Sequence, residues 1–246
     1  WGEGGGATWA PGARGGGQAP RPGGPSLVPV PPPLSLGGAS LLLVTRDEPM
    51  VYAGGTAIQI LIKQGVLFAG NLVDISRVPG LDALDETLEG FRVGPMVSIR
   101  RMGLDPRVRS RSWLAAEAYG RVANPRVRNT ATVGGNIAHG DYRLDPPTAL
   151  LVLDAQVGLT SVRGTRTVPV REFFVDFQLT AVEPGELITF IDVPAAPARA
   201  GSAFVKMSSL SANDWPAASV AALLDRGPEL QILRLGLGAL APVPRF

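Results

Sequence analysis

The chain of 246 residues contains no cysteine and a single histidine, His139. Without thiols it can form no disulfide, no cysteinyl link to a cofactor and no iron–sulfur cluster ligated by its own side chains. One histidine leaves a zinc centre or a Ser-His-Asp triad without its usual groups. We therefore predict no catalytic residue and no metal ligand in this chain, and no acid/base role for His139.

Long apolar runs and aromatic residues are also scarce. No apolar run reaches the length of a membrane-spanning helix, and the N-terminus lacks the basic region and apolar core of a signal peptide. Aromatic residues make up 6%, but hydrophobic residues reach 45%, which is enough for a core. A net charge of +2 argues against a nucleic-acid partner. We expect a cytoplasmic protein with no membrane span, which agrees with the lack of cysteine.

Glycine and proline are abundant instead, and they dominate residues 1–33. Such a segment buries too little apolar surface to offset its chain entropy, so we predict a disordered tail. Beyond it, the apolar periodicity predicts helices at 35–45 and 56–64 and strands at 50–53 and 71–75. This order is a β-α-β unit preceded by a helix, and it indicates a small first lobe.

A second lobe and a third part follow from Pro95 onward. The pattern predicts helical segments at 98–101, 112–123 and 148–153, strands at 156–161, 165–169, 187–193, 202–208 and 230–240, a turn at 183–186 and a linker at 194–201. Arginines cluster in the second lobe, at positions 100, 101, 107, 109, 111, 121, 126 and 128. They form either a solvated helix face or a docking surface for a partner subunit or an acidic cofactor. Arg128 is favoured for a role because it leads into a pair of glycines.

Two glycine pairs carry the main functional signal. Gly54-Gly55 lies between a strand-like and a helix-like segment, and Gly134-Gly135 precedes Asn136. Glycine lets the backbone approach a ligand closely, and successive N–H groups at such a turn can bind an anion. A tight turn explains either pair alone, and neither fits the G-x-G-x-x-G pattern. Together they suggest an anionic ligand held at two places, such as the pyrophosphate of a dinucleotide.

The exact residues of the two motifs, taken together, are specific to one family. Ala53-Gly-Gly-Thr56, followed by ATVGGNIAHGDYRLDPP at 131–147, resembles the FAD-binding (medium) subunit of molybdenum hydroxylases, the xanthine dehydrogenase and carbon monoxide dehydrogenase family. The resemblance implies an α+β chain with the two-lobed FAD-binding fold of the vanillyl-alcohol oxidase and p-cresol methylhydroxylase type. The lobes would occupy 34–94 and 95–197. A small α+β C-terminal domain would follow at 198–246, truncated before the helices that family members normally add.

The resemblance also implies which residues hold the FAD, without a covalent bond. The first glycine segment would line the diphosphate with backbone N–H groups, and the second would grip it with Thr and Asn side chains adding polar contacts. Asp145 would bond the sugar portion of the cofactor or serve only as a helix N-cap. Ile188 would pack on the adenine or flavin or be a plain core residue, and Lys206 would approach the flavin or be a surface lysine. The full set is Val51, Tyr52, Ala53, Gly54, Gly55, Thr56, Ala57, Ile58, Thr132, Gly135, Asn136, Ile137, Asp145, Ile188 and Lys206.

The implied function is electron transfer within a complex. A large molybdopterin subunit would oxidise the substrate, and a small [2Fe–2S] subunit would pass electrons to the FAD on this chain and on to NAD or another acceptor. The complex would be a dimer of heterotrimers. Two alternatives stay open: a self-contained flavin oxidoreductase of the same fold, and a degenerate relative that lost FAD and serves as an interaction module.

Overall fold

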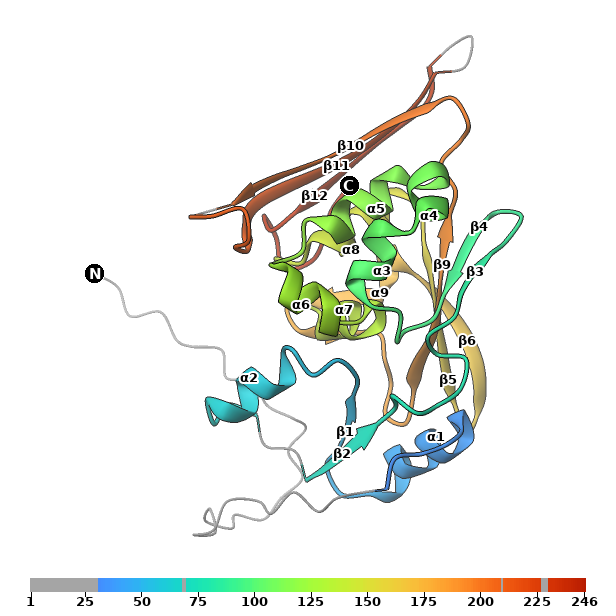
Figure 1. The fold of residues 1–246 in the computed structure, drawn as a ribbon, viewed down its shortest axis with the longest axis vertical. Helices are drawn as coiled ribbons and strands as arrows, with labels where there is room; N and C mark the ends of the chain where they lie inside the picture. The colour runs from blue at the N-terminus through green and yellow to red at the C-terminus, as the bar shows by residue number, and fades with distance from the viewer. Residues whose placement is uncertain (1–30, 68–69, 209, 227–229) are drawn as a thin grey trace.

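The computed structural model describes residues 31–67, 70–208, 210–226 and 230–246 (Figure 1). The expected disordered tail at 1–33 lies almost wholly outside the described residues. None of the helices in these described ranges is long and apolar enough to cross a membrane.

The first lobe contains the predicted helix and β-α-β unit. Its elements are α1 (Leu36–Thr45), β1 (Pro49–Tyr52), α2 (Ile58–Lys63) and β2 (Asn71–Asp74). The Ser35 side chain caps α1 by accepting from the backbone N–H of Gly38 at 3.1 Å. Strands β1 and β2 are parallel, with Val51 opposite Val73, and the crossover through α2 is the connection that a parallel pair requires. The sequence-based order of elements is therefore confirmed here, with α2 shorter than predicted.

The second lobe is built on a five-stranded sheet whose neighbouring strands are antiparallel. In spatial order it contains β3 (Leu84–Glu86), β4 (Gly90–Val93), β9 (Leu187–Pro194), β5 (Gln156–Ser161) and β6 (Gly164–Pro169). Short α9 (Val170–Phe173) leads into a two-stranded hairpin of β7 (Phe174–Asp176) and β8 (Leu179–Thr180). Strands β3 and β4 precede the lobe boundary expected at Gly94, yet they pair with the sheet of the second lobe.

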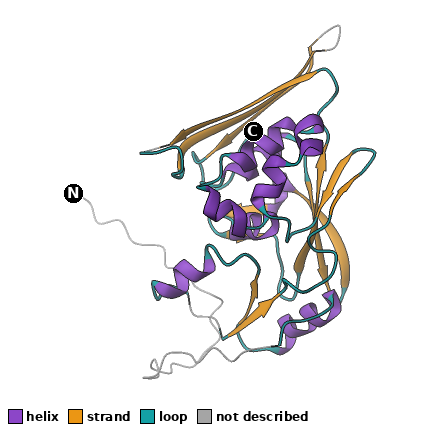
Figure 2. Cartoon of the chain, in the orientation of Figure 1, coloured by secondary structure: helices purple, strands orange, loops and turns teal. Residues whose placement is uncertain are grey.

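A layer of helices packs beside this sheet (Figure 2). It comprises α3 (Ile99–Leu104), α4 (Pro106–Arg111), α5 (Trp113–Gly120), α6 (Pro125–Thr130), α7 (Val133–His139) and α8 (Asp145–Val152). Gly103 lets α3 approach α5 closely, since a Cβ there would lie 3.1 Å from the backbone nitrogen of Gly120. Asn124-Pro125 does more than end the predicted helix at 112–123. The Asn124 side chain accepts from the backbone N–H of Val127 and so begins α6, which the sequence analysis did not foresee.

The third part is an antiparallel sheet that covers the helical layer (Figure 1). Its strands are β10 (Ala200–Ser208), β11 (Pro216–Arg226) and β12 (Leu230–Gly238), and β11 was not predicted. Gly236 lets β12 lie directly on α8, because a Cβ there would come within 3.0 Å of the Thr148 carbonyl oxygen. The opposite face of the sheet exposes apolar side chains, among them Val205, Met207 and Leu235.

Candidate functional site

The two glycine segments lie against each other, although they are far apart in the chain. A Cβ placed on Gly54 would overlap the carbonyl oxygen of Thr130, and a Cβ on Gly135 would lie 4.0 Å from that of Ala53. The absence of a side chain at Gly54 therefore allows the β1–α2 loop to pack directly against the chain just before α7, with Ala53 in van der Waals reach of position 135. The structure thus brings both motifs to one place, between the first lobe and the helical layer.

The β1–α2 loop presents a row of backbone donors. Among the described residues, no acceptor pairs with the backbone N–H groups of Gly54 to Ile58. Gly55 has a φ of +73°, and the Tyr52 ring lies directly against it, fixed by a 2.6 Å hydrogen bond from the Gln59 side chain. Five consecutive half-buried N–H groups on a tightly held loop can bind an anion such as a phosphate.

The second glycine pair does not form a matching backbone cradle, which corrects the expectation of two such cradles. Gly134 and Gly135 lie in the first turn of α7, where the Gly134 N–H donates to the Pro95 carbonyl at 2.9 Å. The Gly135 N–H donates to Oγ1 of the capping residue Thr132 at 3.1 Å. The Val133 and Asn136 N–H groups are also paired, at 2.9 Å each. Contacts from this side to a ligand must therefore come from side chains.

Two of the expected site residues carry a buried side-chain oxygen that lacks a donor. Oδ1 of Asn136 and Oδ1 of Asp145 have no partner among the described residues, and the two residues are 9% and 4% exposed. A buried acceptor without a donor costs about 1–3 kcal/mol. Hydroxyl or N–H groups of a bound molecule would satisfy both oxygens. A dinucleotide carries such donors on its sugars and bases, so the donor and acceptor set fits the group that the sequence implies.

Asp145 and Lys206 contact each other. The Lys206 ammonium donates to Asp145 Oδ2 at 2.8 Å and to the Arg121 carbonyl at 3.2 Å. Burial raises the pKa of Asp145 to about 6, against the opposing effect of Lys206. Asp145 is the first helical residue of α8 and makes no cap, because the N-cap position is Leu144. The N-cap alternative for Asp145 is therefore wrong, and the surface-lysine alternative for Lys206 is wrong as well, since its side chain is 5% exposed.

Three further residues singled out in the sequence make contacts within the protein. Ile188 is 7% exposed and lies in the main core on β9, opposite Leu159 of β5. Ile137 is fully buried in the same core. Arg128 donates to the carbonyls of Val122 and Ala123, both at 2.7 Å, so it stabilises the chain just after α5. These bonds use Nη1 of its guanidinium, and a ligand contact for Arg128 stays a prediction.

Sequence reasoning missed the pair Asp141 and Arg143. Asp141 is 2% exposed, and Arg143 donates to its carboxylate through Nε at 3.0 Å and Nη2 at 2.7 Å. The same Asp-x-Arg spacing gives the same pairing at Asp105 and Arg107. The Asp-x-Arg spacing is the sequence feature that could have predicted this pair. Among the described residues, no cluster of three or more histidine, aspartate or glutamate side chains could hold a metal ion.

Comparison with known proteins agrees with this geometry. Residues 31–196 match the family described as the FAD binding domain in molybdopterin dehydrogenase. The chain belongs to the FAD-binding medium subunits of the molybdenum hydroxylase family. It is 32% identical over 206 residues to the 6-hydroxypseudooxynicotine dehydrogenase complex subunit alpha of Paenarthrobacter nicotinovorans, covering 82% of this chain and 69% of that protein. It is also 32% identical to the carbon monoxide dehydrogenase medium chain of Hydrogenophaga pseudoflava, covering 85% of this chain and 74% of that one.

A solved structure supports the same assignment. Carbon monoxide dehydrogenase from Hydrogenophaga pseudoflava, in a form that lacks the Mo-pyranopterin moiety, superposes on this medium subunit with a TM-score of 0.85 at 32% identity. The match covers 90% of this chain and 77% of that one. The predicted family, the α+β FAD-binding fold and the class of oxidoreductase subunit are therefore confirmed.

Proposed function

We propose that this medium subunit holds one FAD non-covalently between the β1–α2 loop and α7, and passes electrons through it. The donors would be [2Fe–2S] clusters on a small partner subunit, supplied from a molybdopterin centre on a large one. The final acceptor would be NAD or another oxidant. The complex would be a cytoplasmic dimer of heterotrimers. The observation that carries the proposal is the contact between the two glycine segments, beside five backbone N–H groups that lack an acceptor among the described residues.

The first contact would be made by residues 51–58 to the diphosphate. Backbone N–H groups from Gly54 to Ile58 would donate to phosphate oxygens, and the absence of side chains at Gly54 and Gly55 lets the loop pack against Thr130 and the Tyr52 ring in this conformation. The Thr56 hydroxyl would add a donor. Val51, Tyr52 and Ala53 would support the loop from β1, because the Tyr52 ring holds Gly55 in place.

The second contact would come from α7 and α8. Thr132 would hold the first turn of α7 by its cap, with Gly135 giving close approach and Ile137 anchoring the helix in the core. Oδ1 of Asn136 and Oδ1 of Asp145 would accept from hydroxyl or N–H groups of the FAD. These contacts need no backbone donor from the second glycine pair, and Ile188 would support the site from β9.

The flavin supplies the redox chemistry, since it can accept one or two electrons. The task of the chain is to bind it, orient it and set the charge around it. Lys206 was expected to approach the flavin, where a cation would favour the anionic reduced form, but Asp145 lies 2.8 Å from its ammonium. Because opposite charges at this distance largely cancel at longer range, the effect of Lys206 on the flavin would be small while Asp145 is ionised.

The test is reconstitution followed by reduction. The purified apo chain is titrated with FAD while flavin fluorescence and the absorption spectrum are recorded. One FAD bound per chain is expected, and a chain that stays colourless would overturn the proposal and favour the degenerate alternative. The chain co-purified with its partner subunits should then show flavin bleaching on anaerobic reduction of the iron–sulfur clusters. Turnover of a small substrate by the isolated chain would instead favour the self-contained oxidoreductase.

A further inference from the structure

The short segment 141–145, which joins α7 to α8, contacts a residue in or next to each of the three strands of the third sheet. The N–H of Ala239, just after β12, donates to the Tyr142 carbonyl at 3.1 Å. The guanidinium of Arg143 lies 4.9 Å from the ring centroid of Trp215, just before β11. Lys206 of β10 pairs with Asp145. Three contacts in so few residues make this segment a joint between the second lobe and the third sheet.

Arg143 is held in one geometry by its neighbour in sequence. Its backbone N–H donates to Oδ1 of Asp141 at 2.9 Å, and its guanidinium makes two further hydrogen bonds to the same carboxylate. Burial acts to raise the pKa of Asp141, but the hydrogen bonds from Arg143 outweigh it and the pKa lies below its ordinary value. The Asp141 carboxylate and the Arg143 guanidinium thus satisfy each other. The charge of Arg143 is therefore already matched, and its flat face is what remains for other contacts.

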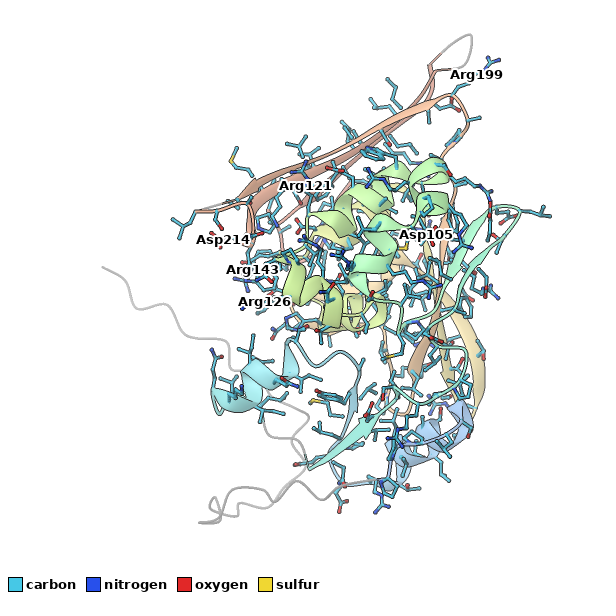
Figure 3. The ribbon with its side chains drawn as sticks, in the orientation of Figure 1. Asp105, Arg121, Arg126, Arg143, Arg199 and Asp214 are labelled. Atoms are coloured by element: carbon cyan, nitrogen blue, oxygen red, sulfur yellow. The ribbon has the colours of Figure 1, made fainter. Side chains whose placement is uncertain are left out.

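Two aromatic rings lie close to the guanidinium. The guanidinium is 5.5 Å from the Tyr142 centroid as well as 4.9 Å from that of Trp215, and Tyr142 in turn meets Phe177 edge to face at 5.5 Å. Trp215 ends a tight connection in which the Ser211 N–H donates to the Asp214 carboxylate at 2.7 Å. Figure 3 labels Arg143 and Asp214 at the end of the sheet where this connection runs.

The contact at Trp215 bears on Lys206 through strand register. Trp215 directly precedes β11, and Ser219 of β11 is the Cα partner of Lys206 on β10. The register shifts at a β-bulge between Met207 and Ser208, so the start of β11 and this bulge together set where the Lys206 side chain enters the interior. The Asp145–Lys206 pair, 4% and 5% exposed, is stable only while both side chains stay in place, because separating them would leave a buried charge unpaired.

We propose that Arg143 is a positioning residue for the FAD site: by stacking on Trp215 it holds the third sheet so that Lys206 stays on Asp145 and leaves Asp145 Oδ1 directed to the cofactor. The inference rests on the proposed FAD binding. Arg143 itself is assigned no contact with FAD. Its role is to hold Asp145 and Lys206, both of which are expected to lie at the FAD site, in position.

The experiment compares Arg143→Ala, Trp215→Leu and the double variant with the wild type. Trp215→Leu is included because Arg143→Ala leaves the buried Asp141 without its partner and can fail to fold, whereas Trp215→Leu leaves no unpaired charge. Arg109→Ala is the matched control, since it removes a similar stack, 4.8 Å from the Trp113 centroid, in the helical layer. FAD dissociation constants are measured by fluorescence. A variant lacking Trp1, Trp9 and Trp113 reports quenching of Trp215 alone by acrylamide in the apo chain.

The expected result is a dissociation constant raised about fivefold or more by Trp215→Leu, no change with Arg109→Ala, and a double variant no weaker than the worse single one. In the single-tryptophan background, Arg143→Ala should increase quenching of Trp215, and Arg143→Lys should restore FAD affinity only in part, because an ammonium cannot make the two-bond pair. Unchanged FAD affinity in a folded Trp215→Leu variant would overturn the inference. Failure of the wild type to bind FAD would instead overturn the proposed function, while the quenching result would still report the stack.

Discussion

Lys206 and Asp145 form an ion pair of 2.8 Å between side chains that are 61 residues apart in the chain and almost fully buried. The pair links β10 to the first turn of α8. It satisfies one carboxylate oxygen and leaves Oδ1 without a donor among the described residues. A single carboxylate thus connects the third sheet to the proposed cofactor site, and the first two predictions concern it.

Lys206→Met is expected to destabilise the apo chain at pH 7 by about 3 kcal/mol, because the buried Asp145 carboxylate would lose its counter-charge. The measurement is urea unfolding followed by circular dichroism. Asp145→Asn combined with Lys206→Met provides the control: removing both charges should recover much of the loss. A single variant as stable as the wild type would show that the pair contributes little.

Stability should also depend on pH through Asp145. Its pKa rises from 3.8 to about 6 on folding, so the folded state binds the proton more tightly than the unfolded state. The stabilisation from the bound proton is fully present below pH 3.8 and is lost as pH rises through about 6, amounting to at most about 3 kcal/mol. Unfolding free energies at pH 5 and pH 7 are compared for the wild type and Asp145→Asn. The difference between the two proteins should change in this window, and parallel pH profiles would contradict the assignment.

Gly55→Val should abolish FAD binding. The positive φ of +73° disfavours a β-branched residue, and the added side chain would overlap the Tyr52 ring that holds the loop. Gly37→Val is the matched control, because a Cβ at Gly37 meets nothing within 4 Å. FAD content after reconstitution is read from the ratio of flavin to protein absorbance. Normal flavin content in Gly55→Val would remove the loop from the site.

Asn136→Ala should act in opposite directions on stability and binding. It removes a buried oxygen that lacks a donor, so the apo chain should be no less stable than the wild type. FAD binding should weaken by about 1–3 kcal/mol, because a hydrogen bond to the cofactor would be lost. Thermal unfolding of the apo chain and an FAD titration separate the two effects. A loss of stability with unchanged FAD affinity would make Asn136 a purely structural residue.

Local patterns in the sequence predicted most of the elements but not how they pair. The β-α-β unit, the strands at 156–161 and 187–193 and the turn at 183–186 follow from periodicity and turn residues, which are local properties. Strands β3, β4 and β11 were missed, and so was the pairing of β4 with β9. These depend on contacts between distant segments, which no short window of residues contains.

The candidate site divides in the same way. The amino-acid sequence by itself determined the two small-residue motifs, the family they belong to and the lack of cysteine, because glycine, Thr and Asn have conformational and hydrogen-bonding properties that do not depend on their surroundings. Tertiary structure alone decided that Pro95 and Val97 occupy the N–H groups at the start of α7, while those of the β1–α2 loop stay without acceptors among the described residues. It also decided that Asp145 meets Lys206 and that Arg143 meets Trp215. The physical reason is that a buried polar group pairs with whichever partner the packing brings within reach.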